Sequence, residues 1–276
     1  MPELPEVETI RRDLARALTG RRFVDVDLLW PGVVRHPSPE DFQRCLVGQR
    51  IREVARRGKY LLIRLDSGDN LAMHLKMSGS LLLRSPSSAL DSYLRAVLTL
   101  DDGNQLRFYD PRKFGGMWLV AEEEAITCKL GPEPFDAAFT PEVLHSRLVR
   151  RAVPIKALLC DQFCLAGVGN IYADEALCDA RIHPLRKAKD ITLEEAERLH
   201  AAIRSVLERA IGNRGTTFRK ESLTNQYRDA YGEAGRNEDA LLVTRRAGAP
   251  CSCCGTPLQR IPIRGRGTYF CPDCQR

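Results

Sequence analysis

Two pairs of cysteines near the C-terminus constrain the fold of this chain more than any other feature. Cys251 and Cys254 are separated by two residues, and Cys271 and Cys274 repeat that spacing after sixteen intervening residues. Each pair can chelate across a tight turn, and four thiolates complete the tetrahedral shell of a structural zinc ion. Cys253 breaks the spacing, and we expect it to be a spare thiol. Residues 258–270 alternate as in a β-hairpin, so the pattern predicts a zinc finger holding one structural Zn²⁺.

Positive charge is concentrated in this finger. Six arginines and one acid lie between Arg245 and Arg276, which gives +5 of the formal net charge of +6. A guanidinium suits phosphate because its planar fork donates two hydrogen bonds at once. A basic block interleaved with cysteines and aromatic residues therefore indicates a nucleic-acid partner. Because many zinc ribbons only bind, a non-catalytic DNA-binding protein remains one interpretation.

The periodicity of the rest of the chain changes from strand-like to helical. Apolar spacing over residues 7–18 predicts a leading helix. Seven short apolar runs separated by turn signals then predict a β-sandwich or barrel. These runs are 24–29, 59–65, 70–75, 80–84, 96–100, 105–109 and 116–121. After a linker at 131–134 the period becomes helical, and a capping box at 192–195 opens a helix that ends at Gly212. Residues 213–240 are polar without a clean period, and we expect a mobile loop.

Membrane and exported proteins are poor candidates. No apolar run approaches the ~18 residues of a membrane span. The first eight residues, MPELPEVE, carry three glutamates and no apolar stretch, so we expect no secretory signal. We expect the cysteines outside the finger to be buried small hydrophobic residues in a reducing compartment. These are Cys45, Cys128, Cys160, Cys164 and Cys178.

The N-terminus offers a possible nucleophile. Removal of the initiator methionine would expose the secondary amine of Pro2, which can attack a sugar C1′ or a carbonyl and form an iminium. Glu3 beside it could move protons. The same residues also fit a plain helix start, with a proline in the first turn and Glu6 and Glu8 at the positive end of the helix dipole. On composition alone, the helix start is the simpler interpretation.

Together with the zinc pairs, several segments resemble the formamidopyrimidine-DNA glycosylase family of bacterial base-excision repair enzymes. They occur in the family's order and span nearly the whole chain. They are MPELPEVETIRR (1–12), RRGKYLL (56–62), HLKMSGSL (74–81), YDPRKFGGM (109–117), LGPEP (130–134), AGVGNIYADEAL (166–177) and GRGTYFCPDC (265–274). The opening PELPE differs from the PEGPE usual in the sister group of endonuclease VIII type. The chain therefore resembles the formamidopyrimidine side of the family.

The resemblance implies an α+β fold in three parts. Residues 1–133 would form an N-terminal β-sandwich catalytic domain with a leading helix. Residues 134–240 would form a helical helix–two-turn–helix domain with a base-covering loop, which the chain matches only at 215–217. Residues 241–276 would form a zinc-finger β-hairpin.

The implied activity is excision of oxidised purines, such as 8-oxoguanine and formamidopyrimidines, from duplex DNA. It is followed by β- and δ-elimination at the abasic site through a Schiff base on the N-terminal proline. The implied partner is damaged double-stranded DNA, with one structural Zn²⁺, no redox or nucleotide cofactor and no membrane. We expect a monomer in the bacterial cytoplasm, acting at the nucleoid. The alternatives are an endonuclease VIII-like glycosylase for oxidised pyrimidines and the non-catalytic zinc-ribbon protein.

The resemblance assigns catalysis to four residues. Pro2 would be the nucleophile and Glu3 its acid/base partner. Lys59 would serve β-elimination, and Arg266 would hold the phosphate and assist δ-elimination. Without the resemblance, Lys59 would be an ordinary solvated lysine and Arg266 a charge at the rim of the finger.

Extraction of a base leaves a hole in the DNA stack that the protein must fill. The resemblance implies that Met77, Arg112 and Phe114 do so. Arg112 would face the orphaned base, and Phe114 would wedge the neighbouring step, offsetting an unstacking cost of a few kcal/mol. Without the resemblance, Met77 and Phe114 would be assigned to the core.

Three further residues are implied to contact the DNA backbone. Asn170 follows Gly167 and Gly169, and the N-terminal amides of the helix after them suit a phosphate. A plain helix–helix turn would need only one of the two glycines. Arg151 matches another backbone-contact position. Tyr93 stands in a segment where the family usually has histidines, and it would take over a DNA contact there.

Overall fold

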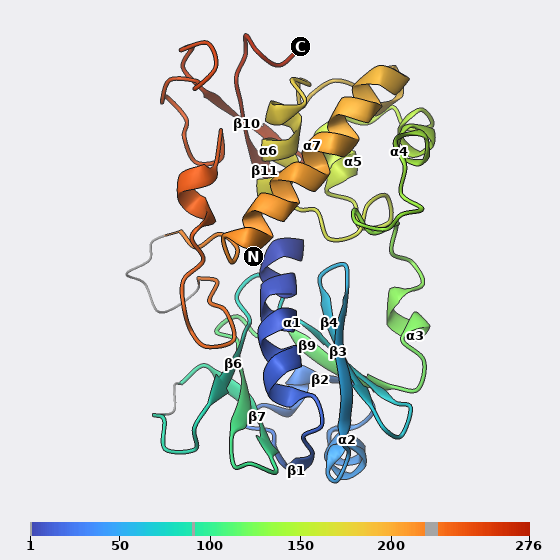
Figure 1. Cartoon of the computed structure of the whole chain (residues 1–276), viewed down its shortest axis with the longest axis vertical. Helices are drawn as coiled ribbons and strands as arrows, with labels where there is room; N and C mark the ends of the chain where they lie inside the picture. Colours follow the sequence, from blue (N-terminus) through green and yellow to red (C-terminus); the bar gives the residue numbers. More distant parts are fainter. Residues whose placement is uncertain (1, 90–91, 219–225) are drawn as a thin grey trace. The chain divides into compact units, whose positions relative to one another are not determined.

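The computed structural model, which describes residues 2–89, 92–218 and 226–276, divides the chain into two units. The N-terminal unit comprises Met1–Cys128 together with Asn213–Glu238, and the C-terminal unit comprises Lys129–Gly212 together with Asp239–Arg276. The segment 213–238 is therefore separated in sequence from the rest of its unit. Figure 1 shows the elements of both units in sequence colours.

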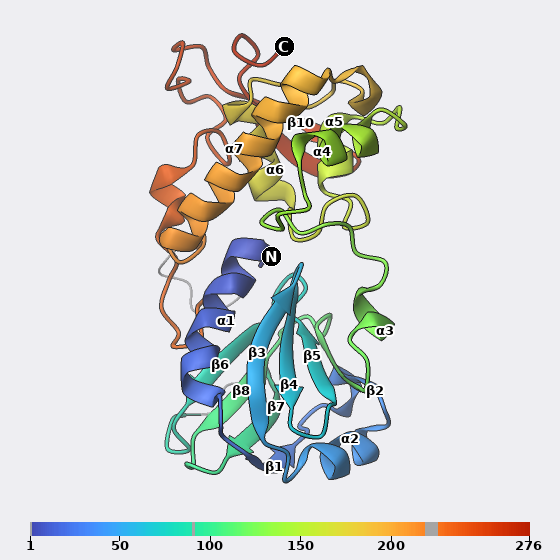
Figure 2. The ribbon, with the colours of Figure 1, turned by 45° about the vertical axis from the view of Figure 1, so that its right-hand side comes forward.

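Helix α1 (Leu4–Leu18) opens the N-terminal unit. It confirms the predicted leading helix and begins three residues earlier, because Glu3 and Glu6 form a capping box around the first turn. Leu4, Ile10 and Leu14 lie on its buried face. Figure 2 shows α1 running alongside β3 (Ile51–Arg57), against which it packs.

Two sheets form the body of the N-terminal unit. The four-stranded sheet has the order β1-β7-β8-β6, and the five-stranded sheet has the order β2-β9-β5-β4-β3, in which only β2 and β9 are parallel. The strands of the first sheet are β1 (Phe23–Asp27), β6 (Ser80–Arg84), β7 (Leu94–Leu100) and β8 (Gln105–Tyr109). Those of the second are β2 (Val34–His36), β3, β4 (Tyr60–Leu65), β5 (Asn70–His74) and β9 (Gly116–Val120). Short helices flank them: η1 (Pro31–Val33), α2 (Pro39–Leu46) and α3 (Glu124–Thr127).

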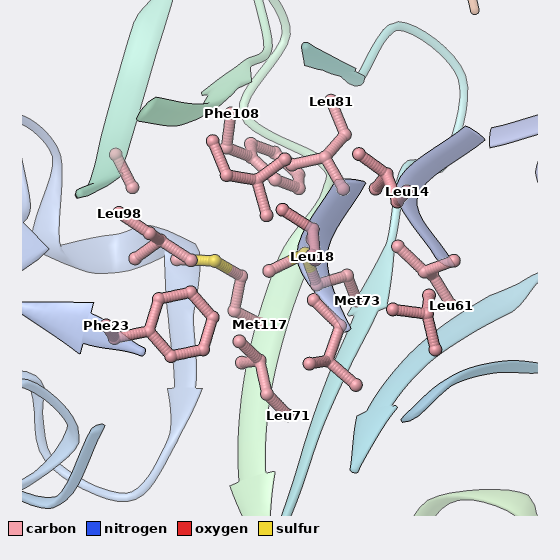
Figure 3. Close-up of a cluster of buried hydrophobic side chains, with 14 of the residues drawn as sticks. Leu14, Leu18, Phe23, Leu61, Leu71, Met73, Leu81, Leu98, Phe108 and Met117 are labelled. Carbon is pink, nitrogen blue, oxygen red and sulfur yellow. The ribbon is translucent and has the colours of Figure 1, made fainter. Parts of the chain in front are cut away.

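One apolar core lies between these sheets and α1. Figure 3 shows Phe23 and Phe108 from the first sheet meeting Met73 and Met117 from the second, with Leu14 of α1 beside them. All seven apolar runs read from the sequence are strands, and the predicted β-sandwich is confirmed. Strand β3 was not predicted because charged residues outnumber the apolar ones in its sequence, IREVARR.

Residues 213–218 and 226–238 are irregular, as expected for a polar segment, but they are packed rather than mobile. Thr217, Asp229 and Ala230 are buried. Arg214 lies 2.6 Å from Asp13 of α1 and 2.5 Å from Asp229. Ion pairs therefore replace apolar contacts as the attachment of this segment, which is why its hydropathy did not reveal the packing. The remainder of the predicted loop, 219–225, lies outside the described residues.

The C-terminal unit is helical with one β-hairpin. Its helices are α4 (Pro141–Leu148), α5 (Ile155–Leu159), α6 (Asn170–Asp179), η2 (Ala188–Asp190) and α7 (Leu193–Gly212), and η3 (Asn237–Ala240) joins it to the preceding segment. The predicted capping box at α7 is present, since Thr192 and Glu195 exchange side-chain to backbone hydrogen bonds of 3.0 and 3.2 Å. The hairpin pairs β10 (Gln259–Ile263) with β11 (Arg266–Phe270).

The five cysteines outside the finger are mostly not buried. Cys45 and Cys128 are exposed, Cys160 and Cys178 are half-buried, and only Cys164 is buried. The expectation of five buried thiols was wrong for the first four, because apolar neighbours in sequence do not share their side of a helix or turn. No helix within the described ranges has the length and apolar character needed to cross a membrane.

Candidate functional site

The N-terminal residues are held in place by hydrogen bonds to Glu6. Pro2 and Glu3 are buried at the head of α1. One carboxylate oxygen of Glu6 accepts the backbone N–H of Glu3 at 2.8 Å, and the other accepts the N–H of Thr216, also at 2.8 Å. The sequence analysis gave Glu6 only a helix-dipole effect. The structure shows that it also joins the start of the chain to the segment 213–238.

Gly215 is required for this junction. Its φ is +81°, and a Cβ at this position would lie 2.8 Å from the Tyr227 ring and 3.0 Å from the Glu6 carboxylate. A larger residue would therefore strain the backbone and displace Glu6. The glycine of the sequence Gly215-Thr216-Thr217 is thus explained by close approach to α1.

Lys59 lies at the tip of the β3–β4 hairpin, in a loop of two residues. Gly58 occupies the first loop position with a φ of +57°, as in a type II′ turn. The Lys59 side chain is buried, so it is not an ordinary solvated lysine.

His74 of β5 adjoins Lys59 and was missed in the sequence. Burial, with the charges of Lys76 and Lys59 adding to it, lowers the pKa of His74 to about 3. Its Nδ1 accepts the backbone N–H of Lys76 at 2.9 Å, and its ring packs edge-on against Tyr60 with centroids 4.7 Å apart. His74 is therefore neutral at physiological pH and carries its proton on Nε2.

Met77, Arg112 and Phe114 lie together on the surface of the N-terminal unit. The Arg112 guanidinium is 4.6 Å from the centroid of the Phe114 ring, and its Nη1 donates to Met77 Sδ at 3.7 Å. Met77 is 50% exposed and Phe114 is 48% exposed. These exposures rule out the alternative that the two residues belong to the core. An exposed apolar pair around an arginine instead fits a surface that binds a partner.

Asp110 organises the loop that carries Arg112 and Phe114. Its buried carboxylate accepts the hydroxyl of Ser78 at 2.6 Å and the backbone N–H groups of Arg112 and Gly115 at 3.2 and 2.7 Å. The loop is thereby tied to the turn that carries Met77. Its backbone N–H donates to the carbonyl of Tyr93 at 2.9 Å, so Tyr93 lies at the base of the same loop, partly exposed. An Asp-Pro pair at the start of a turn was the available sequence signal.

In the C-terminal unit, Asn170 is the first residue of α6 and is tied to the finger. Its Nδ2 donates to the carbonyl of Gly267 at 3.0 Å, next to Arg266. Gly167 has a φ of +87°, which favours glycine, whereas Gly169 is extended at −136°. Only the first glycine of the motif is therefore needed for its backbone angle.

A buried ion pair also holds strand β11. Lys156 lies 2.7 Å from Asp174, and its Nζ donates to the hydroxyl of Thr268 at 2.8 Å. Asp174 accepts the backbone N–H of Tyr269 at 3.1 Å. Burial raises the pKa of Asp174 to about 7, against the attraction of Lys156. Two helices thus fix the strand that begins with Arg266.

Arg151 and Arg266 line the same cavity. It has a volume of about 500 Å³ and also includes Lys156 and Arg264 in its wall. Arg151, Arg264 and Arg266 are exposed. Such a concentration of guanidinium groups suits a phosphate-bearing ligand.

The four predicted cysteine ligands form a cluster. The sulfur atoms of Cys251, Cys254, Cys271 and Cys274 all lie within 4.8 Å of one another. Two of the Sγ–Sγ distances are 3.5 and 3.9 Å. A tetrahedral zinc site with Zn–S bonds of about 2.3 Å has S–S edges of about 3.8 Å. The cluster therefore has the dimensions of a four-thiolate metal site, and Cys253 is outside it.

Two family models match the chain. The formamidopyrimidine-DNA glycosylase N-terminal domain matches residues 1–117, and the formamidopyrimidine-DNA glycosylase H2TH domain matches residues 130–222. Among curated proteins, the formamidopyrimidine-DNA glycosylase of Herpetosiphon aurantiacus is 48% identical over the full length of both chains, and that of Geobacillus kaustophilus is 43% identical over the full length of both.

Solved structures give the same result. The Lactococcus lactis Fpg in complex with an abasic site containing DNA has a TM-score of 0.90 at 32% identity and covers 99% of each chain. The MutM (Fpg) protein of Thermus thermophilus has a TM-score of 0.89 at 41% identity, covering 99% of this chain and 98% of that one.

Proposed function

The chain belongs to the formamidopyrimidine-DNA glycosylase family of base-excision repair enzymes, and on this premise we propose that it removes oxidised purines from duplex DNA. The substrates would be 8-oxoguanine and formamidopyrimidines. The same enzyme would then cleave the abasic strand by β- and δ-elimination through a Schiff base on Pro2. Such a substrate would place the enzyme, acting as a monomer, at the bacterial nucleoid.

The observation that carries this proposal is the buried head of α1, with Pro2 and Glu3 fixed by the Glu6 hydrogen bonds. After removal of the initiator methionine, Pro2 would present a secondary amine at a constant position. The positive end of the helix dipole disfavours an additional positive charge there, which supports the neutral, nucleophilic form of the amine. The adjacent Glu3 carboxyl can transfer protons over the same short range.

The chemistry would proceed in three steps. The Pro2 nitrogen attacks C1′ while the bond from C1′ to the base breaks, and Glu3 supplies a proton, leaving an iminium. Loss of a C2′ proton then expels the 3′ phosphate, a step that the buried Lys59 would serve. Loss of the 5′ phosphate follows, with Arg266 holding the phosphate oxygens.

The remaining predicted residues would bind DNA. Met77, Arg112 and Phe114 would fill the hole left by the extracted base, which their joint exposure supports. Arg151 and Asn170 would contact backbone phosphates, and Tyr93 would add a further contact. The cysteine cluster would hold one structural Zn²⁺, which would supply folding energy to the finger and take no part in the reaction.

Trapping with borohydride tests the mechanism. Reduction of the iminium during turnover should give a stable protein–DNA adduct that maps to Pro2. One extra residue added before Pro2 should abolish trapping while lesion binding is largely retained. Glu3→Gln should bind damaged DNA but cut it poorly, because an amide cannot transfer the proton. Full strand cleavage by the N-terminally blocked protein would refute the mechanism and point to Lys59 as the attacking amine.

A panel of lesion duplexes tests the substrate class. We expect faster excision of 8-oxoguanine and formamidopyrimidines than of oxidised pyrimidines. The reverse order would assign the chain the specificity of endonuclease VIII-type enzymes. Lesion binding with no turnover would identify a non-catalytic DNA-binding protein.

A further inference from the structure

We infer that Arg35, together with Trp30, is a positioning residue for Phe114 and for the base-opposite contact of Arg112. Neither residue belongs to the catalytic or DNA-contacting set assigned above. The inference rests on the proposed function, because it concerns the accuracy with which the void-filling loop is presented to DNA.

Arg35 holds both backbone carbonyls that flank Phe114. It lies on β2, whereas the loop precedes β9, the parallel neighbour of β2. Its Nη2 donates to the carbonyl of Gly115 at 3.0 Å and approaches that of Lys113 at 3.4 Å. Lys113 has a φ of +58°, a conformation that a non-glycine residue adopts only when its surroundings hold it. A single guanidinium therefore fixes the backbone on each side of the exposed Phe114 ring.

The second glycine of the loop exists for this contact. A Cβ on Gly116 would lie 2.8 Å from Cγ and 3.0 Å from Nε of Arg35. The Arg35 stem thus lies directly on the backbone of residue 116. Gly115 has a different cause, since a Cβ there would meet the Phe108 ring at 2.7 Å. The Gly-Gly pair after Phe114 thus accommodates two separate side chains, and one of them is Arg35.

Trp30 provides the platform on the other side of Arg35. The guanidinium carbon of Arg35 is 5.8 Å from the Trp30 ring centroid, and Nζ of Lys113 is 5.3 Å from it. Both distances fall within the range of cation–π attraction. Gly32 permits the ring to lie across the chain, since a Cβ there would be 2.6 Å from the indole. The ring thereby links β2 to the loop through two cations.

The loop is consequently held from two directions. Asp110 accepts N–H groups at its two ends from inside the unit, and Arg35 donates to its carbonyls from the side of β2. Between these anchors only Arg112, Lys113 and Phe114 project into solvent. Loss of Arg35 would leave Phe114 attached on one side only. A wedge with more freedom should discriminate less well between bases opposite the lesion, because that contact depends on the angle of Arg112.

The test compares single-turnover excision of 8-oxoguanine placed opposite cytosine and opposite adenine. Arg35→Ala should reduce the ratio of the two rates about three- to tenfold, as expected for loss of hydrogen bonds worth about a kcal/mol. Arg35→Lys keeps the charge without the fork and should recover part of the ratio. Arg44→Ala removes an exposed arginine of the same unit and should leave the ratio unchanged.

Two further readouts separate positioning from direct DNA contact. In the Phe114→Ala background, Arg35→Ala should cause no further loss, because both changes remove the same wedge. The salt dependence of DNA binding should stay unchanged, whereas loss of a phosphate contact would lower its slope by about 1. Additive losses, or a reduced salt slope, would overturn the inference.

The outcomes also distinguish the inference from the proposed function. If Phe114→Ala alters the ratio and Arg35→Ala does not, the inference fails and the proposed function stands. If Phe114→Ala leaves the ratio unchanged, the void-filling assignment fails, and the inference fails with it.

Discussion

Removal of the Arg214 side chain should destabilise the N-terminal unit by about 2 kcal/mol. Arg214 is the cation shared by two carboxylates, Asp13 on α1 and Asp229 in the segment 213–238. The carboxylate side chains are 3% and 1% exposed, whereas that of Arg214 is 38% exposed. Arg214→Met would keep the aliphatic stem and leave both carboxylates buried without their cation.

The magnitude follows from two limits. Breaking a fully buried ion pair by removal of one partner costs about 3–5 kcal/mol, and an exposed pair contributes about 0–1 kcal/mol. Because Arg214 is more than one-third exposed, solvent screens part of the interaction, and a value near 2 kcal/mol is expected. With a urea m-value of about 2 kcal/mol/M, the unfolding midpoint should fall by about 1 M.

Tryptophan fluorescence is a selective assay for this change. Both tryptophans of the chain, Trp30 and Trp118, lie in the N-terminal unit. Arg44→Met is the matched control, since Arg44 pairs with Asp41 on the surface of the same unit and is 77% exposed. It should change the free energy of unfolding by no more than about 0.5 kcal/mol.

A double-mutant cycle identifies the source of the loss. In the Asp13→Asn background one of the two carboxylates is already neutral, so Arg214→Met should cost at least about 0.5 kcal/mol less than in the wild type. Equal losses for Arg214→Met and Arg44→Met, or the same loss in both backgrounds, would refute the claim that this ion-pair cluster attaches the segment to α1.

Three other changes test the remaining parts of the site. Cys254→Ser or Cys271→Ser should abolish stoichiometric zinc, measured by elemental analysis, and weaken DNA binding, while the tryptophan-detected unfolding midpoint of the N-terminal unit stays unchanged; absence of zinc from the wild type would contradict this. Arg112→Ala should weaken opposite-base discrimination by roughly 1–3 kcal/mol, whereas Arg266→Ala should weaken binding to all damaged duplexes and reduce its salt slope by about 1; identical losses in both would contradict the assignment. His74→Gln should remove a pH dependence: with a folded pKa of about 3, wild-type stability is complete above pH 6.5 and falls towards pH 3 by up to about 1.4 kcal/mol per unit, and parallel stability–pH curves would contradict it.

Local patterns in the sequence were sufficient to predict much of the fold. Apolar runs marked seven strands because each buries several residues in the sandwich core. The capping box at Thr192 and the cysteine spacing were equally informative, since both involve contacts over short stretches of chain. Strand β3 was not recognised because only Ile51 and Val54 of its seven residues are fully buried. Its position is set by pairing with β4 and by α1, and a pattern within the strand does not show these partners.

The candidate site shows the same limit more sharply. Met77 and Phe114 would be assigned to the core from residue type alone, and only their exposure in the structure indicates a binding surface. The segment 213–238 follows the helices in sequence but packs in the N-terminal unit. Its attachment uses Arg214 and Glu6, which bind partners about 200 residues away along the chain. Periodicity reports burial along one element and carries no information about such distant partners.

The residues that escaped the sequence analysis share one physical property. Glu6, Asp110 and Arg35 each use a charged side chain to bind backbone groups of a neighbouring turn. Such contacts need no spacing in the sequence, because the partner is a main-chain N–H or C=O that every residue type except proline can provide. Glu6 was within reach, since it completes an acidic capping box three residues after Glu3. Arg35 was not, because its partner carbonyl lies 80 residues further along the chain. The side chains that would perform chemistry are therefore accessible from motifs, whereas those that orient them become visible only when the backbone they bind has been placed.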